Sequence, residues 1–140
     1  VSNISGATNT FGASTYYAHE VGNNEIALDG TETAIPAYIQ SGDFDLPTQG
    51  DGEYMLRLSR FLPDFKNLQG NAVVTIFLKN FPVDSGTSSQ LGPFTINANT
   101  DKIDTRARGR LANIKIQNTA VDETWRFGTF RADVNPDGRR

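Results

Sequence analysis

The 140-residue sequence has no cysteine and a single histidine, His19. The lack of cysteine excludes disulfides, thiol catalysis and cysteine-ligated zinc sites. One histidine provides neither a two-histidine metal site nor a serine–histidine–aspartate triad with a second histidine beside it, and we interpret His19 as a structural or surface residue. No apolar run approaches the roughly 20 residues that a membrane-spanning helix needs. We therefore expect no catalytic residue, no metal, no cofactor and no membrane-spanning segment.

Charge is distributed unevenly along the chain, although the net charge is only −3. Residues 1–50 carry six acidic side chains and no Lys or Arg, whereas residues 101–140 carry nine basic side chains and six acidic ones. An acidic first part and a basic last part complement each other within one fold, or between copies in a ring. Ordinary solvated surface is the alternative interpretation.

The arginines also raise the question of nucleic-acid binding. Arginine close to Trp, Phe and Tyr would provide a platform on which bases stack. The chain as a whole is acidic, however, with a pI of about 5.0. This balance is far from the basic footprint of an autonomous nucleic-acid binder.

Short strand-like segments dominate the sequence, and helical periodicity is absent. Apolar and polar residues alternate with period two, which is typical of half-buried strands, and the expected strands span residues 15–21, 26–28, 35–41, 54–58, 72–81, 94–98, 112–116 and 125–134. Pro36 confines its segment to an edge or a strand start. The apolar run 72–81 predicts a central strand covered on both faces, and residues 83–92 predict a flexible polar loop.

Strand spacing predicts the fold class. Strands recur every 8 to 14 residues, which favours an all-β fold: an antiparallel β-sandwich, barrel or propeller-like sheet with little or no helix. We expect residues 1–14 to be an extended arm or loop and residues 15–140 to be a single all-β domain. The chain begins with Val and not Met, which indicates a processed protein or part of a longer chain.

Arginine parity is the most unusual local feature. Arg106, Arg108 and Arg110 have the same parity as the apolar residues of the run 112–116. An uninterrupted strand would therefore direct three guanidinium groups along the face that it buries. Either the strand changes phase around Gly109 and returns the arginines to solvent, or that face meets another subunit, where arginine pairs bidentately with carboxylates.

Parity also changes later in the chain. Trp125 and Phe127 share one parity, whereas Phe130 and the apolar residues after it share the other. A strand that keeps its apolar face inward must gain one residue between them. We expect a β-bulge at Gly128-Thr129, because glycine tolerates the backbone conformation that a bulge requires.

Asp43 and Asp45 are the one pair of carboxylates with suggestive spacing. On a strand, residues two apart lie on the same side, as in a calcium site or a glycosidase pair. No further acidic residues follow at ligand spacing. A solvated face, or one paired with arginine, is the interpretation that we favour.

Several motifs together resemble the C-terminal region of bacteriophage virion structural proteins, most closely the tail-nozzle or tail-tube proteins of short-tailed phages. In chain order they are HEVG (19–22), YIQSGDFD (38–45), YML (54–56), RFLPDF (60–65), GPFT (92–95), DTRARGR (104–110), WRFG (125–128) and PDGRR (136–140). The resemblance covers roughly residues 15–140. The RxRGR, WRxG and PDGRR elements are specific in combination and weak singly.

This resemblance implies a structural protein of the virion and not an enzyme. Its members are β-rich subunits repeated in a ring, such as a hexamer, at the distal end of the tail, with other tail proteins as partners and with DNA passing through without sequence-specific binding. They are usually far longer, so this chain would correspond to a C-terminal piece or to the terminal module alone. The expected interface residues are Arg106, Arg108, Arg110, Arg126, Arg131, Arg139 and Arg140, with Trp125 as a core or interface anchor.

Two other functions stay open. A carbohydrate-binding β-sandwich for host recognition would use exposed aromatic side chains, for which Tyr16, Tyr17, Tyr38 and Trp125 are the candidates. A self-assembling filament subunit would pair its arm, residues 1–13, with the sheet edge of the next copy.

Overall fold

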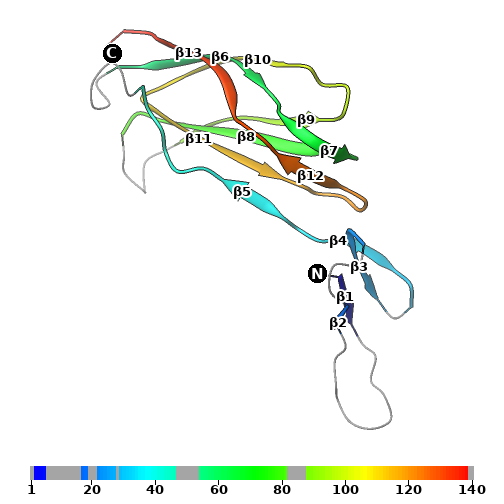
Figure 1. Ribbon diagram of the computed structural model, residues 1–140. Helices are drawn as coiled ribbons and strands as arrows, with labels where there is room; N and C mark the ends of the chain where they lie inside the picture. Colours follow the sequence, from blue (N-terminus) through cyan, green and yellow to red (C-terminus); the bar gives the residue numbers. More distant parts are fainter. Residues whose placement is uncertain are drawn as a thin grey trace.

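The computed structural model describes residues 2–5, 17–18, 22–27, 29–46, 54–81 and 88–138. These residues form an all-β fold, and none of them is helical (Figure 1). The prediction of an all-β fold is therefore confirmed. Within the same ranges there is accordingly no helix with the length and apolar character that crossing a bilayer requires. His19, Arg139 and Arg140, for which we made predictions, lie outside the described residues.

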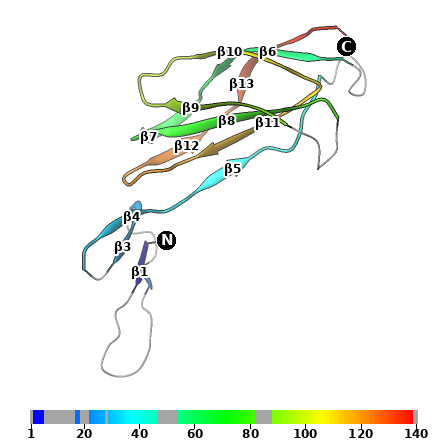
Figure 2. The ribbon, with the colours of Figure 1, turned by 180° about the vertical axis from the view of Figure 1, so that it is seen from behind.

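Two facing layers of antiparallel strands form the body of the molecule (Figure 1, Figure 2). The first sheet has the order β5–β11–β8–β9 and consists of β5 (Tyr38–Gln40), β8 (Ala72–Lys79), β9 (Ser89–Ile96) and β11 (Leu111–Gln117). The facing sheet has the order β10–β6–β13 and consists of β6 (Leu56–Leu62), β10 (Ile103–Gly109) and β13 (Arg131–Pro136). A further pair adjoins this second sheet and consists of β7 (Phe65–Gln69) and β12 (Thr124–Phe127).

A small separate sheet precedes the body. It has the order β2–β1–β3–β4 and consists of β1 (Ser2–Ser5), β2 (Tyr17–Ala18), β3 (Asn24–Ala27) and β4 (Glu32–Ala34). Part of the segment that we expected to be an arm is therefore a strand. β1 lies between β2 and β3 of its own chain, so both of its edges are paired internally.

Asn24 attaches the β3–β4 hairpin to the body. The Nδ2 of this buried side chain donates a hydrogen bond to Asp122 Oδ1, and its Oδ1 accepts one from the Asp122 backbone N–H, both at 2.7 Å. The segment between the hairpin and β5 is attached in the same way: the Asn118 side chain accepts from the Ala37 N–H at 2.9 Å and donates to the Ile35 carbonyl at 2.7 Å. These bonds fix the hairpin on the turn that precedes β12.

The hydrophobic core lies between the two layers of the body. Alternation directs Leu56 and Leu58 inward from β6, and an irregularity in the register between Leu58 and Arg60 brings Phe61 to the same face. From the other sheet, alternation directs Ile76, Ile114 and Ile116 inward. Each of these side chains is at most 5% exposed. Burial of aliphatic and aromatic surface from two sheets is the main stabilising contribution in such a sandwich.

The apolar run 72–81 occupies the expected central position, because β8 pairs with both β11 and β9. Cover on both faces was expected, and this part of the prediction is wrong. Val74 and Ile76 are fully buried, but Val73 and Phe77 on the opposite face remain partly exposed, since no further layer of the described chain packs over that face. The predicted loop 83–92 is also too long, since β9 begins at Ser89.

The phase change expected around Gly109 is confirmed. β10 ends at this residue and β11 begins at Leu111, and the two strands belong to different sheets. Ala107 and Gly109 are therefore the buried residues of β10, whereas Arg106 and Arg108 are exposed. A Cβ on Gly109 would lie 3.1 Å from Leu78 Cβ, so this crossing between the sheets is tightly packed.

The bulge expected at Gly128-Thr129 is a strand break instead. β12 ends at Phe127 and pairs with β7, whereas β13 begins at Arg131 and pairs with β6. The bend lies opposite Asp64, whose carbonyl accepts the Gly128 N–H at 2.7 Å and whose Oδ2 accepts the Thr129 N–H at 3.1 Å. The parity shift thus reflects a change of partner strand and not an extra residue within one strand.

Candidate assembly surfaces

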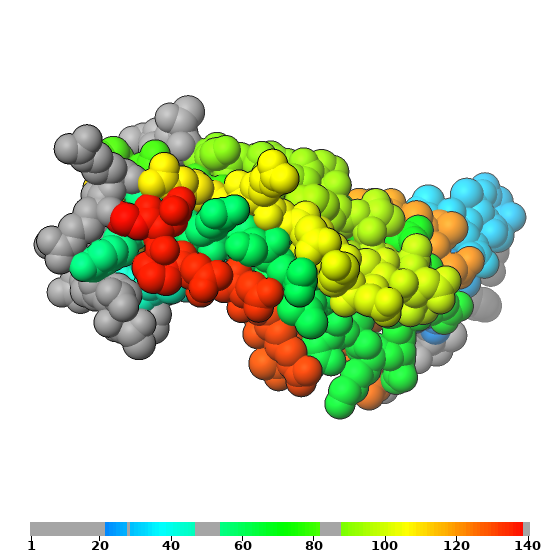
Figure 3. All heavy atoms as spheres, turned by 90° about the horizontal axis from the view of Figure 1, so that it is seen from above, coloured from blue at the N-terminus to red at the C-terminus, as the bar shows by residue number. Residues whose placement is uncertain are grey.

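The outer surface of the β10–β6–β13 sheet carries the arginines that the sequence singled out. We call this surface the arginine face, and it comprises Arg57, Arg60, Arg106, Arg108 and Arg131. Figure 3 shows β13, β6 and β10 side by side across it. The register places Arg108 opposite Arg57, and Arg60 opposite both Asp104 and Asp133. Three strands that are distant in the sequence therefore contribute to one charged surface.

Part of the arginine face is neutralised within the chain. Arg60 Nε lies 3.0 Å from Asp104 Oδ1, and its Nη1 lies 3.8 Å from Asp133 Oδ2. The Arg60 hydrogen bond, with help from Lys102, holds the pKa of Asp104 below its ordinary value. All these side chains are substantially exposed, so each pair contributes little to stability.

Arg108 is also paired within the chain, whereas Arg131 makes only a long contact. Arg108 Nε lies 2.7 Å from Asp137 Oδ2, and its Nη2 donates to the Asp137 carbonyl at 2.9 Å. Arg131 Nη2 approaches Asp64 Oδ2 at 3.9 Å, at the limit of an ion pair.

The remaining two cations of the arginine face, and two cations on the neighbouring β7–β12 pair, have no ion pair within the described residues. Arg57 and Arg106 are exposed, and Arg57 lies directly opposite the like-charged Arg108. Arg126 of β12 lies in the same way opposite Lys66 of β7, and both are exposed. Like charges directly opposite each other in a sheet are destabilising. Of these paired cations, Arg108 has an ion pair with Asp137, whereas Arg57, Arg126 and Lys66 have none within the described residues.

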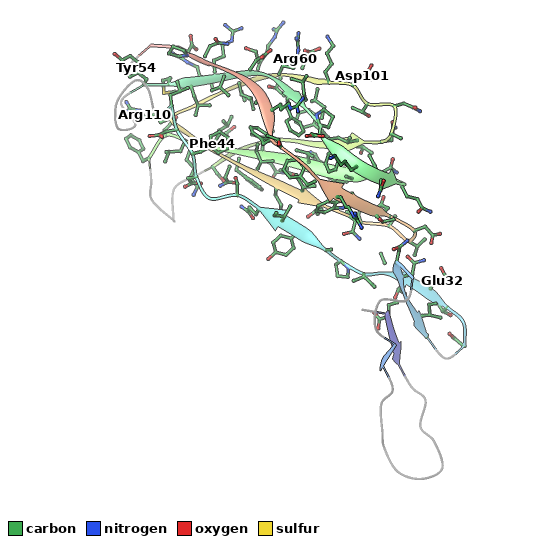
Figure 4. The ribbon with its side chains drawn as sticks, in the orientation of Figure 1. Glu32, Phe44, Tyr54, Arg60, Asp101 and Arg110 are labelled. Atoms are coloured by element: carbon green, nitrogen blue, oxygen red, sulfur yellow. The ribbon has the colours of Figure 1, made fainter. Side chains whose placement is uncertain are left out.

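Arg110, also a predicted interface residue, lies away from this surface. It follows the crossing between the sheets at Gly109, and its backbone N–H donates a hydrogen bond to the Lys79 carbonyl at 2.9 Å. Its guanidinium carbon lies 5.9 Å from the centre of the Phe81 ring, within the range of a cation–π contact. Figure 4 shows Arg110 at the end of the sandwich, apart from Arg60. The structure thus separates Arg110 from Arg106 and Arg108, with which it alternates in the sequence.

An apolar cleft opens on the side of the sandwich where β5 forms the sheet edge. Its volume is about 270 Å³, and its lining is mainly apolar: Ile39, Gln40, Ser41, Phe44, Ile114, Ile116, Phe127 and Phe130. Tyr38 and Ile39, on the adjacent edge, are 67% and 50% exposed. Ile39 belongs both to this exposed edge and to the cleft, whereas Tyr38 lies on the outer face of the sheet, where Lys115 Nζ is 4.8 Å from the centre of its ring. Sequence reasoning missed this cleft. The proline-flanked Tyr38-Ile39 pair was the only sequence signal for it.

Trp125 lines a second hollow, of about 310 Å³, beside the attachment of the hairpin. The indole is half-buried and meets the Phe65 ring edge-on, with 6.1 Å between the ring centres. Asn118 and Glu123 also line this hollow. Both are committed elsewhere: Asn118 holds the segment before β5, and Glu123 Oε2 accepts the Thr119 and Ala120 N–H groups at 2.6 and 2.8 Å. The tryptophan is therefore mainly a packing residue at the margin of the core.

Asp43 and Asp45 do not form a paired site. Asp43 Oδ2 lies 2.9 Å from Lys79 Nζ, and its Oδ1 accepts a hydrogen bond from Asn113 Nδ2 at 2.7 Å. These contacts, the Asn113 bond foremost, lower the pKa of Asp43 from its ordinary value. Among the described residues there is no group of three or more His, Cys, Asp or Glu side chains able to hold a metal ion.

Comparisons with known proteins identify no relative. No model of a known protein family matches the chain, and no curated protein sequence matches it either.

Proposed function

We propose that the chain is a structural subunit of a bacteriophage virion tail, of the nozzle or tail-tube type, and that it acts by assembling into a ring and not as an enzyme. The order of sequence motifs supports the virion assignment. In this proposal the chain resides in the virion, contacts other tail proteins and allows DNA to pass without reading its sequence.

The observation that carries the assembly part of the proposal is the apolar cleft beside β5. Monomeric proteins rarely leave contiguous apolar surface exposed unless a partner covers it. Here the half-exposed Ile39 lines a cleft bounded by Phe44, Phe127 and Phe130. Interfaces combine such an apolar centre with a polar or charged rim rich in arginine.

The test is the native mass of the chain, measured by light scattering at physiological and at high salt. An assembly several times heavier than the 15.3 kDa chain is expected. Replacement of Ile39 by Asp should reduce the assembled fraction without loss of folded protein, because Ile39 lies on a half-exposed edge. A monomer under all conditions would contradict the assembly proposal.

A second candidate function, glycan binding during host recognition, is favoured by the hollow at Trp125. An aromatic ring beside amide and carboxylate groups is a typical sugar platform, and this hollow has all three. The hydrogen bonds that occupy Asn118 and Glu123 argue against it. Glycan-array binding that disappears in Trp125→Ala and persists in Tyr38→Ala would favour this candidate.

A further inference from the structure

The β3–β4 hairpin is acidic and exposed. The described residues from 22 to 46 include Glu25, Asp29, Glu32, Asp43 and Asp45, but no Lys or Arg. Three of these acids belong to the hairpin, two on its strands and Asp29 at the turn. Asp29 Oδ1 accepts the Thr31 N–H at 2.9 Å, and this bond lowers the pKa of Asp29. The turn of the hairpin therefore presents a carboxylate, Asp29, that remains charged at neutral pH.

The position of the hairpin prevents it from reaching the arginine face of its own chain. Figure 1 and Figure 2 both show β3 and β4 projecting from the end of the body beyond β5, on the side away from β10, β6 and β13. In Figure 4, Glu32 and Arg60 lie far apart in the same way. The bonds between Asn24 and Asp122 fix this arrangement. Ion pairs between the hairpin and the arginine face can form only between two copies.

The arginine face has cations that need such partners. Arg57 and Arg106 have no ion pair within the described residues, and Arg57 faces Arg108 across the strand pair. Guanidinium groups in this arrangement favour carboxylates, which they bind bidentately. Phosphates of nucleic acid would also fit the guanidinium groups, but a net charge of −3 and a pI near 5.0 work against that partner.

We propose that the β3–β4 hairpin of one copy binds the arginine face of the next, with Glu25 and Asp29 placed against Arg57, Arg106 and Arg108. The proposal rests on the assembly proposed above and specifies one of its contacts. The two surfaces differ, so the contact is head-to-tail, and its repetition closes a ring when the rotation between copies allows it. Each copy then binds one neighbour through its hairpin and the other neighbour through its arginine face, so that both surfaces of every copy are occupied.

Reversal of charge on each surface tests this contact. The first variant carries Arg57→Glu and Arg106→Glu. The second carries Glu25→Arg and Asp29→Asn, since Asn at 29 keeps the acceptor for the Thr31 N–H. A third variant carries Arg57→Glu alone, and its control is Lys115→Glu on the outer surface of the other sheet, because both replacements change the net charge equally. Circular dichroism establishes that every variant is folded, and light scattering measures the assembled fraction.

Each variant alone should assemble at least about tenfold more weakly than wild type, whereas an equimolar mixture of the first two should assemble again, because each then offers the surface that the other needs. Lys115→Glu should assemble like wild type. If wild type assembles and both reversed variants do so equally well, this contact is wrong and the assembly proposal stands. If wild type is a monomer at every salt concentration, both proposals fail. If the arginine variant keeps its mass but loses affinity for a 20-base-pair DNA duplex, the face binds nucleic acid and the hairpin contact is overturned.

Discussion

The two sheets of the body share one core, but their outer surfaces are built differently. On the β5–β11–β8–β9 sheet, polar groups satisfy one another: Asp43 binds Lys79 and Asn113, Asn113 accepts from Gln40 Nε2 at 3.2 Å, and Lys115 lies 4.8 Å from the centre of the Tyr38 ring. On the β10–β6–β13 sheet, by contrast, Arg57 and Arg106 remain without an ion pair in the described chain, and Arg57 faces the like-charged Arg108. Both outer surfaces carry charged residues. They differ in whether these residues have partners within the chain, and the surface whose cations lack ion pairs is the one available to another molecule.

The largest expected effect concerns the core on which both surfaces depend. Phe61 is fully buried and stacks on Phe130, with ring centres 5.1 Å apart. Phe61→Ala should lower the free energy of unfolding by about 3–5 kcal/mol, since it leaves a cavity between the sheets. The neighbouring Leu62, 37% exposed on the other side of β6, provides the control: Leu62→Ala should cost less than about 1 kcal/mol. Urea unfolding measures both, and similar values for the two would contradict the packing described here.

A smaller effect is expected at the bend that ends β12. A Cβ on Gly128 would lie 2.7 Å from Asp64 Oδ2 and 3.1 Å from the Asp64 carbonyl oxygen, closer than real contacts allow. Gly128→Ala should therefore destabilise the protein by about 1–3 kcal/mol through displaced backbone. Gly42→Ala has open space around it and should be nearly neutral. Thermal melts of both variants check this contrast, and equal melting temperatures would show that the bend is not tightly packed.

Replacement of Asp43 tests whether contacts among the polar groups on the outer surface of the β5–β11–β8–β9 sheet stabilise the fold. Asp43→Asn keeps an acceptor for Asn113 but removes the ion pair with Lys79, so it should cost about 0.2–1 kcal/mol at pH 7. The pKa of Asp43 is lowered in the folded state, so its contribution is complete above the ordinary value near 3.8 and is lost as pH falls through the folded-state pKa. Urea unfolding should therefore show a smaller difference between wild type and Asp43→Asn at pH 2.5 than at pH 7. Asp45→Asn, with no ion pair in the described residues, is the control.

The smallest expected effect has the opposite sign. Arg57→Gln removes a like charge opposite Arg108 and should raise the free energy of unfolding by about 0.2–0.5 kcal/mol at low salt. The gain should vanish at high salt, where repulsion is screened. Arg60→Gln, which breaks pairs with Asp104 and Asp133, should not stabilise the monomer. If both replacements stabilised the protein, the ion pairs of Arg60 would not distinguish it from Arg57, which contradicts this prediction.

Local patterns in the sequence were sufficient for much of the fold. Alternation predicted most strands of the body but not β7, and it predicted one strand where β12 and β13 lie. The apolar run 72–81 predicted the central strand β8, and Pro36 predicted an edge, where β5 lies. Parity also predicted the phase change at Gly109 as one of two interpretations, and the structure shows it. Each of these inferences needs only residues that are close in the sequence.

The remainder depends on partners that are distant in the sequence. The apolar cleft exists because Ile39 pairs with Ile116, and Phe44 forms a bridge with Ala112, beside Phe130 from the segment between β12 and β13. Parity correctly marked a change at Gly128 but could not identify Asp64 as the residue opposite. The arginines were recognised as unusual, but only the register shows that Arg57 belongs with them.

The position of β6 has a consequence for how the chain folds. This strand lies between β10 and β13, although it precedes both in the sequence, and its register with β13 joins Leu58 to Val134. During synthesis the strand has neither neighbour until residues beyond 103 have been made, and its second neighbour comes only with residues 131–136. Contacts between such distant segments slow folding, because long loops must close before any pairing is gained. The sheet that contains β6 is therefore complete only after the last strand has been made. A chain that stops before β13 leaves one edge of β6 unpaired.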